Sequence, residues 1–243
     1  MDSTINRRDF IKATTATTAG VAALGAGITL TTYVNANENP VTNEKRWGML
    51  VDTNRLTESD IDGMVTACQK EHGWGDETHS TGDQKASWIK KIKVKDTATQ
   101  RISNLALMCQ HCEEPPCVDV CPTNASMKRE DGIVLVDKHR CIGCRYCMMA
   151  CPYDARSFVH EDITNQKEHM PRGKGTVESC TMCVHKVDKG GQPACVEAVN
   201  SDAVIFGDLL DVTSNIHQTL KRVQSTQIRA DLNLNTAVRY SGI

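Results

Sequence analysis

Cysteine is the residue type through which this chain can do chemistry, because its twelve cysteines recur at a defined spacing. The stretch "CIGCRYCMMACP" at 141–152 reads C-x2-C-x2-C-x3-C-P, the spacing by which thiolates hold a [4Fe–4S] cluster. The stretch "CQHCEEPPCVDVCP" at 109–122 repeats this spacing with two inserted residues. In such a block three thiolates hold one cluster, and the fourth, which precedes proline, reaches the neighbouring cluster.

That exchange sorts the cysteines into ligand sets. The first predicted set is Cys109, Cys112, Cys117 and Cys151, and the second is Cys141, Cys144, Cys147 and Cys121. A third block supplies Cys180, Cys183 and Cys195, but "ACVEAVNSD" has Val199–Asn200 where the other blocks have Cys–Pro. Cys68 is the one cysteine left, so we predict that it completes the third set.

The cysteine that is missing at position 199 would be a ligand of a fourth cluster, and the other three ligands of that cluster are missing too. A complete block ending at Cys68 would need cysteines at the positions of Glu58, Ile61 and Met64, and its last ligand would come from Val199. Three [4Fe–4S] clusters therefore use all twelve cysteines. Two alternatives stay open, namely that Glu58 or another group completes an unusual fourth cluster, or that Cys68 is a buried free thiol.

Other cysteine chemistries fit the spacing less well. Zinc ribbons use C-x2-C pairs at longer separation, and a tetrahedral zinc ion needs four ligands in all. Disulfides between cysteines two residues apart are strained, and domains held by disulfides alone are usually shorter. No C-x-x-C-H sequence indicates covalent haem. A structural metal protein without redox function remains the alternative from another class.

The N-terminal 36 residues resemble a signal for export. Arg7 and Arg8 precede the apolar pair Phe10–Ile11 and a mildly apolar stretch, and "VNA" at 34–36 offers a small-residue cleavage site. This is the pattern of a twin-arginine (Tat) signal, which is either cleaved after Ala36 or kept as an anchor. Because the Tat route carries folded proteins, it suggests a cofactor assembled before export and a periplasmic location.

The composition indicates that the hydrophobic core alone does not supply the stability of the fold. Aromatic residues make up only 4% of the 243 residues, and the net charge of −2 gives no reason to expect nucleic acid as a partner. No apolar run is long enough for a membrane span, so any membrane association is expected through partners. The cysteine-bound clusters would supply part of the stability.

The elements between the cysteines predict an α+β fold of two ferredoxin-like modules, one split by insertion of the other. Short strands are predicted at 46–52, 132–137 and 203–209, with a helical turn from Cys144 to Cys151. The continuous module covers about 105–160, and the split one about 46–70 plus 176–208, within an iron–sulfur domain at 37–243. The tail at 209–243 is expected to pack, with Ile216, Leu220 and Val223 at helical spacing.

Several polar residues near the cysteines are not predicted to be ligands. His111, His139 and His185 are expected to make hydrogen bonds or to face solvent. The stretch "WIKKIKVK" at 88–95 is expected to be a solvated strand or an edge that touches a partner.

The arrangement of blocks resembles the NrfC/PsrB-type iron–sulfur subunits that accompany membrane quinone-reacting proteins. The resemblance runs from about Trp47 to Tyr240 and includes "HCEEPPCVDVCPTNA", "DGIVLVDKHRCIGCRYCMMACPYDAR", "SCTMCVHK" and "FGDLLD". Usual members hold four clusters. The loss of one cluster in "VDTNRLTESDIDGMVTACQKEH", together with the export signal, is closer to the DsrO-type subunits of DsrMKJOP complexes.

This resemblance implies an electron-transfer subunit that is not itself an enzyme. It would relay electrons through three [4Fe–4S] clusters between an NrfD/DsrP-like membrane quinol protein and a DsrJ-like multihaem cytochrome c, in sulfite or sulfate respiration. The alternative is the electron-transfer subunit of a molybdopterin oxidoreductase of the polysulfide, thiosulfate or nitrite type.

Overall fold

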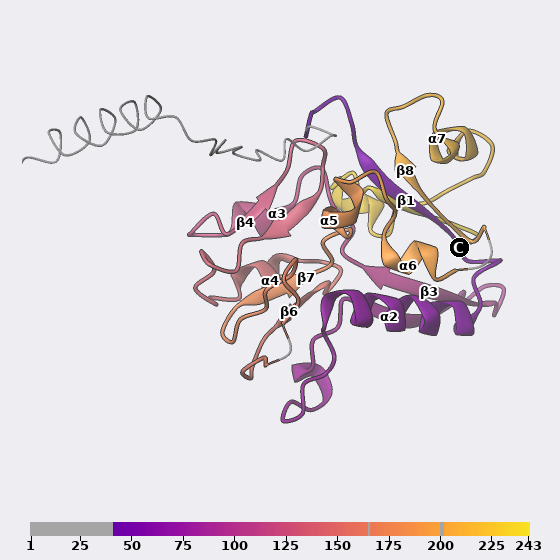
Figure 1. Ribbon diagram of the computed structural model, residues 1–243. Coiled ribbons are helices and arrows are strands. Elements are labelled where there is room, and N and C mark those ends of the chain that lie inside the picture. The colour runs from indigo at the N-terminus through magenta and orange to yellow at the C-terminus, as the bar shows by residue number, and fades with distance from the viewer. Residues whose placement is uncertain (1–40, 165, 200–201) are drawn as a thin grey trace, which may run out of the picture. The chain divides into compact units, whose positions relative to one another are not determined.

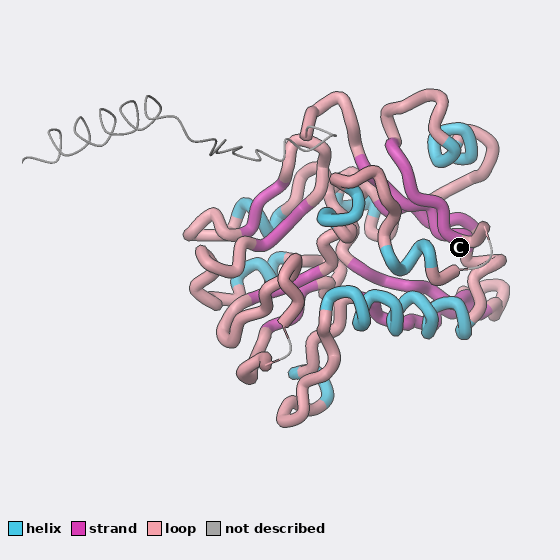
Figure 2. The backbone as a smooth tube through the Cα atoms, viewed as in Figure 1, coloured by secondary structure: helices cyan, strands magenta, loops and turns pink. Residues whose placement is uncertain are grey.

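Pairs of short strands join the cysteine-bearing segments along the chain (Figure 1). The computed structural model describes residues 41–164, 166–199 and 202–243. The export signal predicted over 1–36 lies outside these residues. Figure 2 shows that short helices and strands alternate with long loops, which is the expected result when cofactor ligands rather than a large core set the path of the chain.

Three of the strand pairs are antiparallel hairpins, which lie between successive cysteine blocks. β2 (Ile89–Lys95) pairs with β3 (Ile102–Met108), β4 (Ser126–Lys128) with β5 (Val134–Val136), and β6 (Arg156–Phe158) with β7 (Val177–Ser179). The first hairpin follows Cys68, the second follows Cys121 and the third follows Cys151. Each hairpin thus carries the chain from the last cysteine of one block to the first cysteine of the next.

The fourth pair joins the two ends of this series. β1 (Trp47–Asp52), which precedes Cys68, pairs antiparallel with β8 (Val204–Asp208), which follows Cys195. β9 (Val238–Ser241) then pairs in parallel with the other edge of β1. The segments 46–70 and 176–208 therefore meet through a strand pair, and the C-terminal tail supplies a strand of the same sheet.

α2 (Glu58–His72) is a regular helix of 15 residues. At its start the Thr57 hydroxyl accepts a hydrogen bond from the Asp60 amide, and the Asp60 carboxylate accepts one from the Thr57 amide, at 3.1 and 2.9 Å. At its end Gly73 takes a left-handed φ of 69°, which a residue with a Cβ adopts at a cost. α2 packs against β2 and against α6 (Ala194–Glu197).

The other helices are one or two turns long. They are α3 (Pro116–Asp119), α4 (Tyr146–Ala150), α5 (Val184–Val187) and α7 (Asn215–Leu220), with 3-10 turns at Gly82–Gln84 and Ala230–Leu232. α4 lies in the helical turn predicted from Cys144 to Cys151. The predicted C-terminal helix is shorter than its apolar spacing suggested. Ile216 is fully buried, but α7 ends at Leu220, so Val223 lies beyond it and is 38% exposed.

The described residues form an α+β fold whose main core includes some cysteines of two ligand sets, namely Cys68, Cys109, Cys112, Cys180 and Cys195. Trp88 and Tyr240 are among its largest fully buried side chains. The Tyr240 hydroxyl accepts from Gln110 and donates to the Ala106 carbonyl oxygen, each at 3.1 Å, so its burial leaves no unpaired hydroxyl. Among the described helices, none is both long and apolar enough to cross a membrane.

Candidate metal centre

Three C-x-x-C loops share one unusual backbone conformation. The residue before the second cysteine has a positive φ in each, at 43° for His111, 71° for Gly143 and 54° for Met182. Histidine and methionine rarely adopt this region, so its recurrence at equivalent positions indicates the same ligand-presenting turn. At Gly143 a Cβ would lie 2.2 Å from the Gly175 carbonyl oxygen, so this loop also requires glycine for close backbone approach.

The first set of thiols converges on one cavity. Cys109, Cys112, Cys117 and Cys151 all line it, together with Tyr153 and three prolines. Burial raises the pKa of Cys109 to about 12, and the neighbouring charge of Cys117 acts in the same direction. Burial likewise raises the pKa of Cys112 to about 12. The structure therefore brings Cys151 to the three cysteines of the preceding block.

The second set lies nearer the surface. Burial and the neighbouring charges of Cys141 and Cys121 raise the pKa of Cys147, against the opposing effect of Arg156. The Ser126 amide donates to Cys121 Sγ at 3.3 Å, and the Val177 amide donates to Cys141 Sγ at 3.4 Å.

Exposure distinguishes two members of this set. Cys144 is exposed, and its place beside the others follows from the short loop between Cys141 and Cys147. Cys121 is half-buried. Burial would raise its pKa, but hydrogen bonds from the Ser126 amide and from Thr123 lower it overall.

The third set is fully inside the protein. Cys68, Cys180, Cys183 and Cys195 are all buried. Burial raises the pKa of Cys68 well above its usual value, and the neighbouring charge of Cys195 adds to the effect. Burial also raises the pKa of Cys180, followed by the charges of Cys68 and Cys195. Cys68, which is far from the third block in the chain, thus stands next to its three cysteines.

Hydrogen-bond donors surround the third set. The Trp74 indole Nε1 donates to Cys68 Sγ at 3.2 Å, and the Met182 amide donates to Cys180 Sγ at 3.4 Å. Cys183 Sγ accepts from the Ala194 amide at 3.4 Å and lies 3.1 Å from His72 Nε2. N–H groups directed at sulfur favour the thiolate form, which is the form that binds metal.

Apolar packing occupies the positions at which a fourth set would need cysteines. Ile61 and Met64 are fully buried on α2, and Val199 is 9% exposed. Burying an aliphatic side chain of this size stabilises a fold by about 1.5–3 kcal/mol. Glu58 lies apart from them at the surface, where its carboxylate pairs with Lys93 Nζ at 2.6 Å. The segment before Cys68 is a continuous helix, whereas the other three blocks contain the positive-φ turn between their first two cysteines.

The first set lies between the other two, because its cysteines and those of each neighbouring set affect one another's pKa. The charge of Cys109, in the first set, contributes to the raised pKa of Cys180 in the third. The charge of Cys147, in the second set, contributes to the raised pKa of Cys117 in the first. The buried Arg156 lies at this second junction, where its Nη2 donates to Cys117 Sγ at 3.0 Å.

The donor atoms fit sulfur-rich metal clusters. Arg156 Nε and Nη1 and the Thr181 hydroxyl are buried without a hydrogen-bond partner among the described residues, although each belongs to a residue beside the cysteines. Unpaired buried donors cost free energy, and bridging sulfides next to the thiolates would accept from them. A buried set of four thiols also cannot ionise together without a cation to neutralise the charge.

Residues that support the cysteines were harder to find from the sequence than the cysteines themselves. Trp74 follows Cys68 by six residues, which places it just past α2, but only the fold shows its bond to sulfur. Arg156 and His72 carry no sequence signal for their roles. Of the histidines considered earlier, His111 Nδ1 accepts from the Val134 amide at 3.0 Å, His185 bonds Glu71, and His139 is exposed.

Several known proteins match this chain. Residues 101–209 match the family model described as the 4Fe-4S dicluster domain. The Hdr-like menaquinol oxidoreductase iron-sulfur subunit 1 of Archaeoglobus fulgidus is 39% identical, over 98% of this chain and 98% of that protein. The arsenate respiratory reductase iron-sulfur subunit of a Shewanella species is 30% identical, over 80% of this chain and 95% of its own length. A tetrathionate reductase subunit of Salmonella typhimurium is 45% identical, but the match covers 53% of this chain and 47% of that protein.

Proposed function

This chain belongs to the family of iron–sulfur subunits that carry the 4Fe-4S dicluster domain, and we propose that it relays electrons through three [4Fe–4S] clusters. Its named relatives are electron-transfer subunits of oxidoreductase complexes rather than the catalytic subunits. The proposal is supported by the spacing of the twelve cysteines, and by the positions of Cys151 and Cys68 beside the cysteines of the first and third sets. The ligands are Cys109, Cys112, Cys117 and Cys151 for the first cluster, Cys121, Cys141, Cys144 and Cys147 for the second, and Cys68, Cys180, Cys183 and Cys195 for the third.

The order of the sets supports a relay. The third set neighbours the first, and the first neighbours the second, so three clusters would stand in a row. When bound, [4Fe–4S] clusters supply one-electron chemistry at potentials set by burial, charge and hydrogen bonds to sulfur. The exposure of Cys144 makes the second set the end of the row at which a redox partner has access.

The chain's own residues would hold and tune these clusters. Amides and the Trp74 indole donate hydrogen bonds to thiolate sulfurs, and each such bond favours the reduced state with its extra negative charge. Arg156 adds a buried positive charge beside the first and second sets, with the same direction of effect. The apolar side chains around the third set keep water from its sulfurs.

We further propose that the protein works outside the cytoplasmic membrane as a DsrO-type subunit. The Arg7–Arg8 signal supports export by the Tat route to the periplasm, and the full-length likeness to a menaquinol oxidoreductase subunit supports a membrane quinol partner. A DsrP-like quinol protein and a DsrJ-like multihaem cytochrome c would then be its partners in sulfite or sulfate respiration.

A second candidate function has its own support. The arsenate respiratory reductase subunit is matched over 95% of its length, and the tetrathionate reductase subunit shares 45% identity over the matched part. In this alternative the chain would serve the molybdopterin subunit of a reductase for a sulfur or nitrogen compound. Reduction of the purified protein by a menaquinol analogue only when a DsrP-like protein is present would favour the first candidate.

Metal analysis tests the cluster assignment directly. Three cubanes correspond to about 12 iron and about 12 acid-labile sulfide per chain. The protein should be purified anaerobically, and both contents should be measured on the same sample. A content of about 16 iron, or a predominance of zinc, would contradict the proposal of three clusters.

Export is tested separately. Replacing Arg7 and Arg8 together by Lys should leave a folded, iron-loaded precursor in the cytoplasm, because the Tat route requires the arginine pair. Cell fractionation with iron analysis of each fraction is the measurement. Normal export of this variant would overturn the assignment of the signal while leaving the cluster assignment intact.

A further inference from the structure

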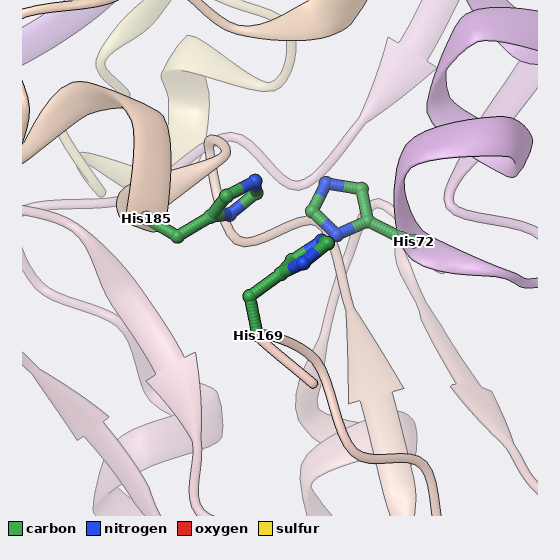
Figure 3. Close-up of side chains that lie close together, drawn as sticks. All are labelled: His72, His169 and His185. Atoms are coloured by element: carbon green, nitrogen blue, oxygen red, sulfur yellow. The ribbon is translucent and has the colours of Figure 1, made fainter. Parts of the chain in front are cut away.

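Three histidines from separate parts of the chain meet beside the third cysteine set. His72 is the last residue of α2, His169 lies between β6 and β7, and His185 lies on α5. One ring nitrogen of each lies within 4.8 Å of those of the other two. Figure 3 shows the three imidazoles turned toward a shared space. His72 is fully buried, whereas the side chains of His169 and His185 are 34% and 19% exposed, so the cluster runs from the surface inward.

Each of the three rings makes its hydrogen bond through its own Nε2. His72 Nε2 lies 3.1 Å from Cys183 Sγ, His169 Nε2 bonds the Glu71 carbonyl oxygen at 3.0 Å, and His185 Nε2 bonds Glu71 Oε1 at 2.7 Å. Metal-binding histidines usually have their second nitrogen held in this way by a carboxylate or carbonyl oxygen. His72 Nδ1 is buried and has no partner among the described residues. No hydrogen bond among the described residues therefore competes with a metal ion for that nitrogen.

We propose that His72, His169 and His185 bind one divalent transition-metal ion, for which zinc is the best fit. Imidazole nitrogen is a preferred zinc ligand, and three histidines leave a fourth position for water. Tetrahedral zinc with bonds of about 2.0–2.1 Å places its ligand atoms about 3.4 Å apart. The rings must therefore close in, and the stacked pair His169–His185, with centroids 4.0 Å apart, must open. The partly exposed His169 is on a loop and can make this movement.

The site would also act on the third cluster, a consequence that rests on the proposed function. His72 would bind the ion, and its Nε2 lies 3.1 Å from Cys183 Sγ. The imidazole ring of His72 would therefore connect the ion to a cluster ligand. A positive charge at that place favours addition of an electron to the cluster. Zinc binding should therefore raise the potential of the third cluster and leave that of the second, at the other end of the row, unchanged.

Cobalt(II) and zinc titrations of the anaerobic protein with its clusters assembled test the proposal. We expect one equivalent of cobalt to bind with the visible absorption of a tetrahedral ion, and zinc to displace it. His169→Ala should abolish this binding, since it removes a ligand that does not touch the cysteines. Glu71→Gln should weaken binding by about 10- to 100-fold, because it removes the carboxylate that positions the His185 ring. His139→Ala, an exposed histidine near the second set, is the matched control.

Iron content measured in the same samples separates the two hypotheses. Full iron with no cobalt bound, or equal cobalt binding by the wild type and His169→Ala, would overturn the metal site and leave the clusters standing. Low iron in the wild type would contradict the clusters instead. A zinc-dependent rise in the potential of the third cluster, seen in the wild type and in His139→Ala but absent in His169→Ala, would support both.

Discussion

The second and third cysteine sets have the same ligand chemistry in opposite surroundings. Cys144 of the second set is exposed, Cys121 and Cys141 are half-buried, and Ile142 and Met149 beside them are 67% and 83% exposed. Every cysteine of the third set is buried in the protein interior. Because solvent and hydrogen bonds both tune cluster potentials, clusters held by these two sets would differ in potential although their ligands are identical. The exposed set suits exchange with a partner, and the buried set suits storage of charge away from water.

Removing one cysteine from each set is the strongest test of this difference. Cys68→Ala should lose the third cluster or convert it to [3Fe–4S], because no water or added thiol can reach the vacated iron position. Cys144→Ala should keep four irons when a small external thiol is supplied, since the exposed position lets that thiol replace the cysteine. EPR spectra and iron content of both variants, with and without the thiol, are the measurements.

Two results would contradict these expectations. Three unchanged [4Fe–4S] signals with full iron in Cys68→Ala would show that Cys68 only fills space in the core. Equal rescue of both variants by the thiol would show that the third set is open to solvent. Val199→Cys serves as a further control and should add no iron, since Glu58, Ile61 and Met64 still offer no thiolates.

A buried ion network lies close to the third set in the chain, because Glu178 precedes Cys180 by two residues, and its loss should give the next largest effect. Arg172 bonds Glu178 with Nε and Nη2, at 2.9 and 2.8 Å, and also pairs with Glu77, all three side chains being at most 2% exposed. Arg172→Met would leave two buried carboxylates unpaired and lower the free energy of unfolding by about 3–5 kcal/mol. Lys174→Ala, which removes an exposed pair with Asp162, should cost about 0–1 kcal/mol.

Denaturant unfolding of the cluster-loaded protein measures this prediction. The third-cluster signal should disappear at lower denaturant in Arg172→Met than in the wild type. Equal unfolding midpoints for the two variants would show that the network contributes no more than a surface pair.

The positive charge of Arg156 should affect the reduction potentials of the first and second clusters but not that of the third. Arg156→Gln removes a charge-assisted bond to Cys117 and should lower the potentials of the first and second clusters, each by on the order of 60 mV, the one-electron equivalent of about 1.4 kcal/mol. The third cluster should keep its potential. Redox titration followed by EPR measures all three, with the exposed Arg140 changed to Gln as control. A shift confined to the third cluster would contradict the predicted order of the sets.

A single indole N–H should have the smallest effect. Trp74→Phe keeps an aromatic ring but removes the donor to Cys68, a neutral hydrogen bond whose net contribution is about 1 kcal/mol. The potential of the third cluster should fall by roughly 40 mV, while the second cluster is unaffected. Trp47→Phe is the control, because Trp47 stacks on Phe206 at 5.3 Å instead of bonding sulfur. Equal potentials in both variants would show that the bond does not tune the cluster.

The blocks of cysteines can be recognised in the sequence because cysteine spacing is a local property, and their assignment as cluster ligands stays a prediction. The same locality explains the strands near 47–52, 134–136 and 204–208, because each coincides with a short apolar segment of the sequence. It could not reveal that β9 joins β1 or that Trp74 and Arg156 reach sulfur, since these contacts depend on how distant segments pack. The apolar spacing of Ile216, Leu220 and Val223 overextended the last helix, because spacing carries no information about where the chain leaves the surface.

The partner of the first strand is made late during synthesis. β1 pairs with β8, so Trp47 finds its partner Asp208 only after roughly 160 further residues have been added, which takes about 8–32 s at about 5–20 residues per second. All twelve cysteines leave the ribosome in this interval, while one edge of β1 is still unpaired. The sheet that joins the two ends of the cysteine series can therefore form only after all twelve cysteines have been synthesised.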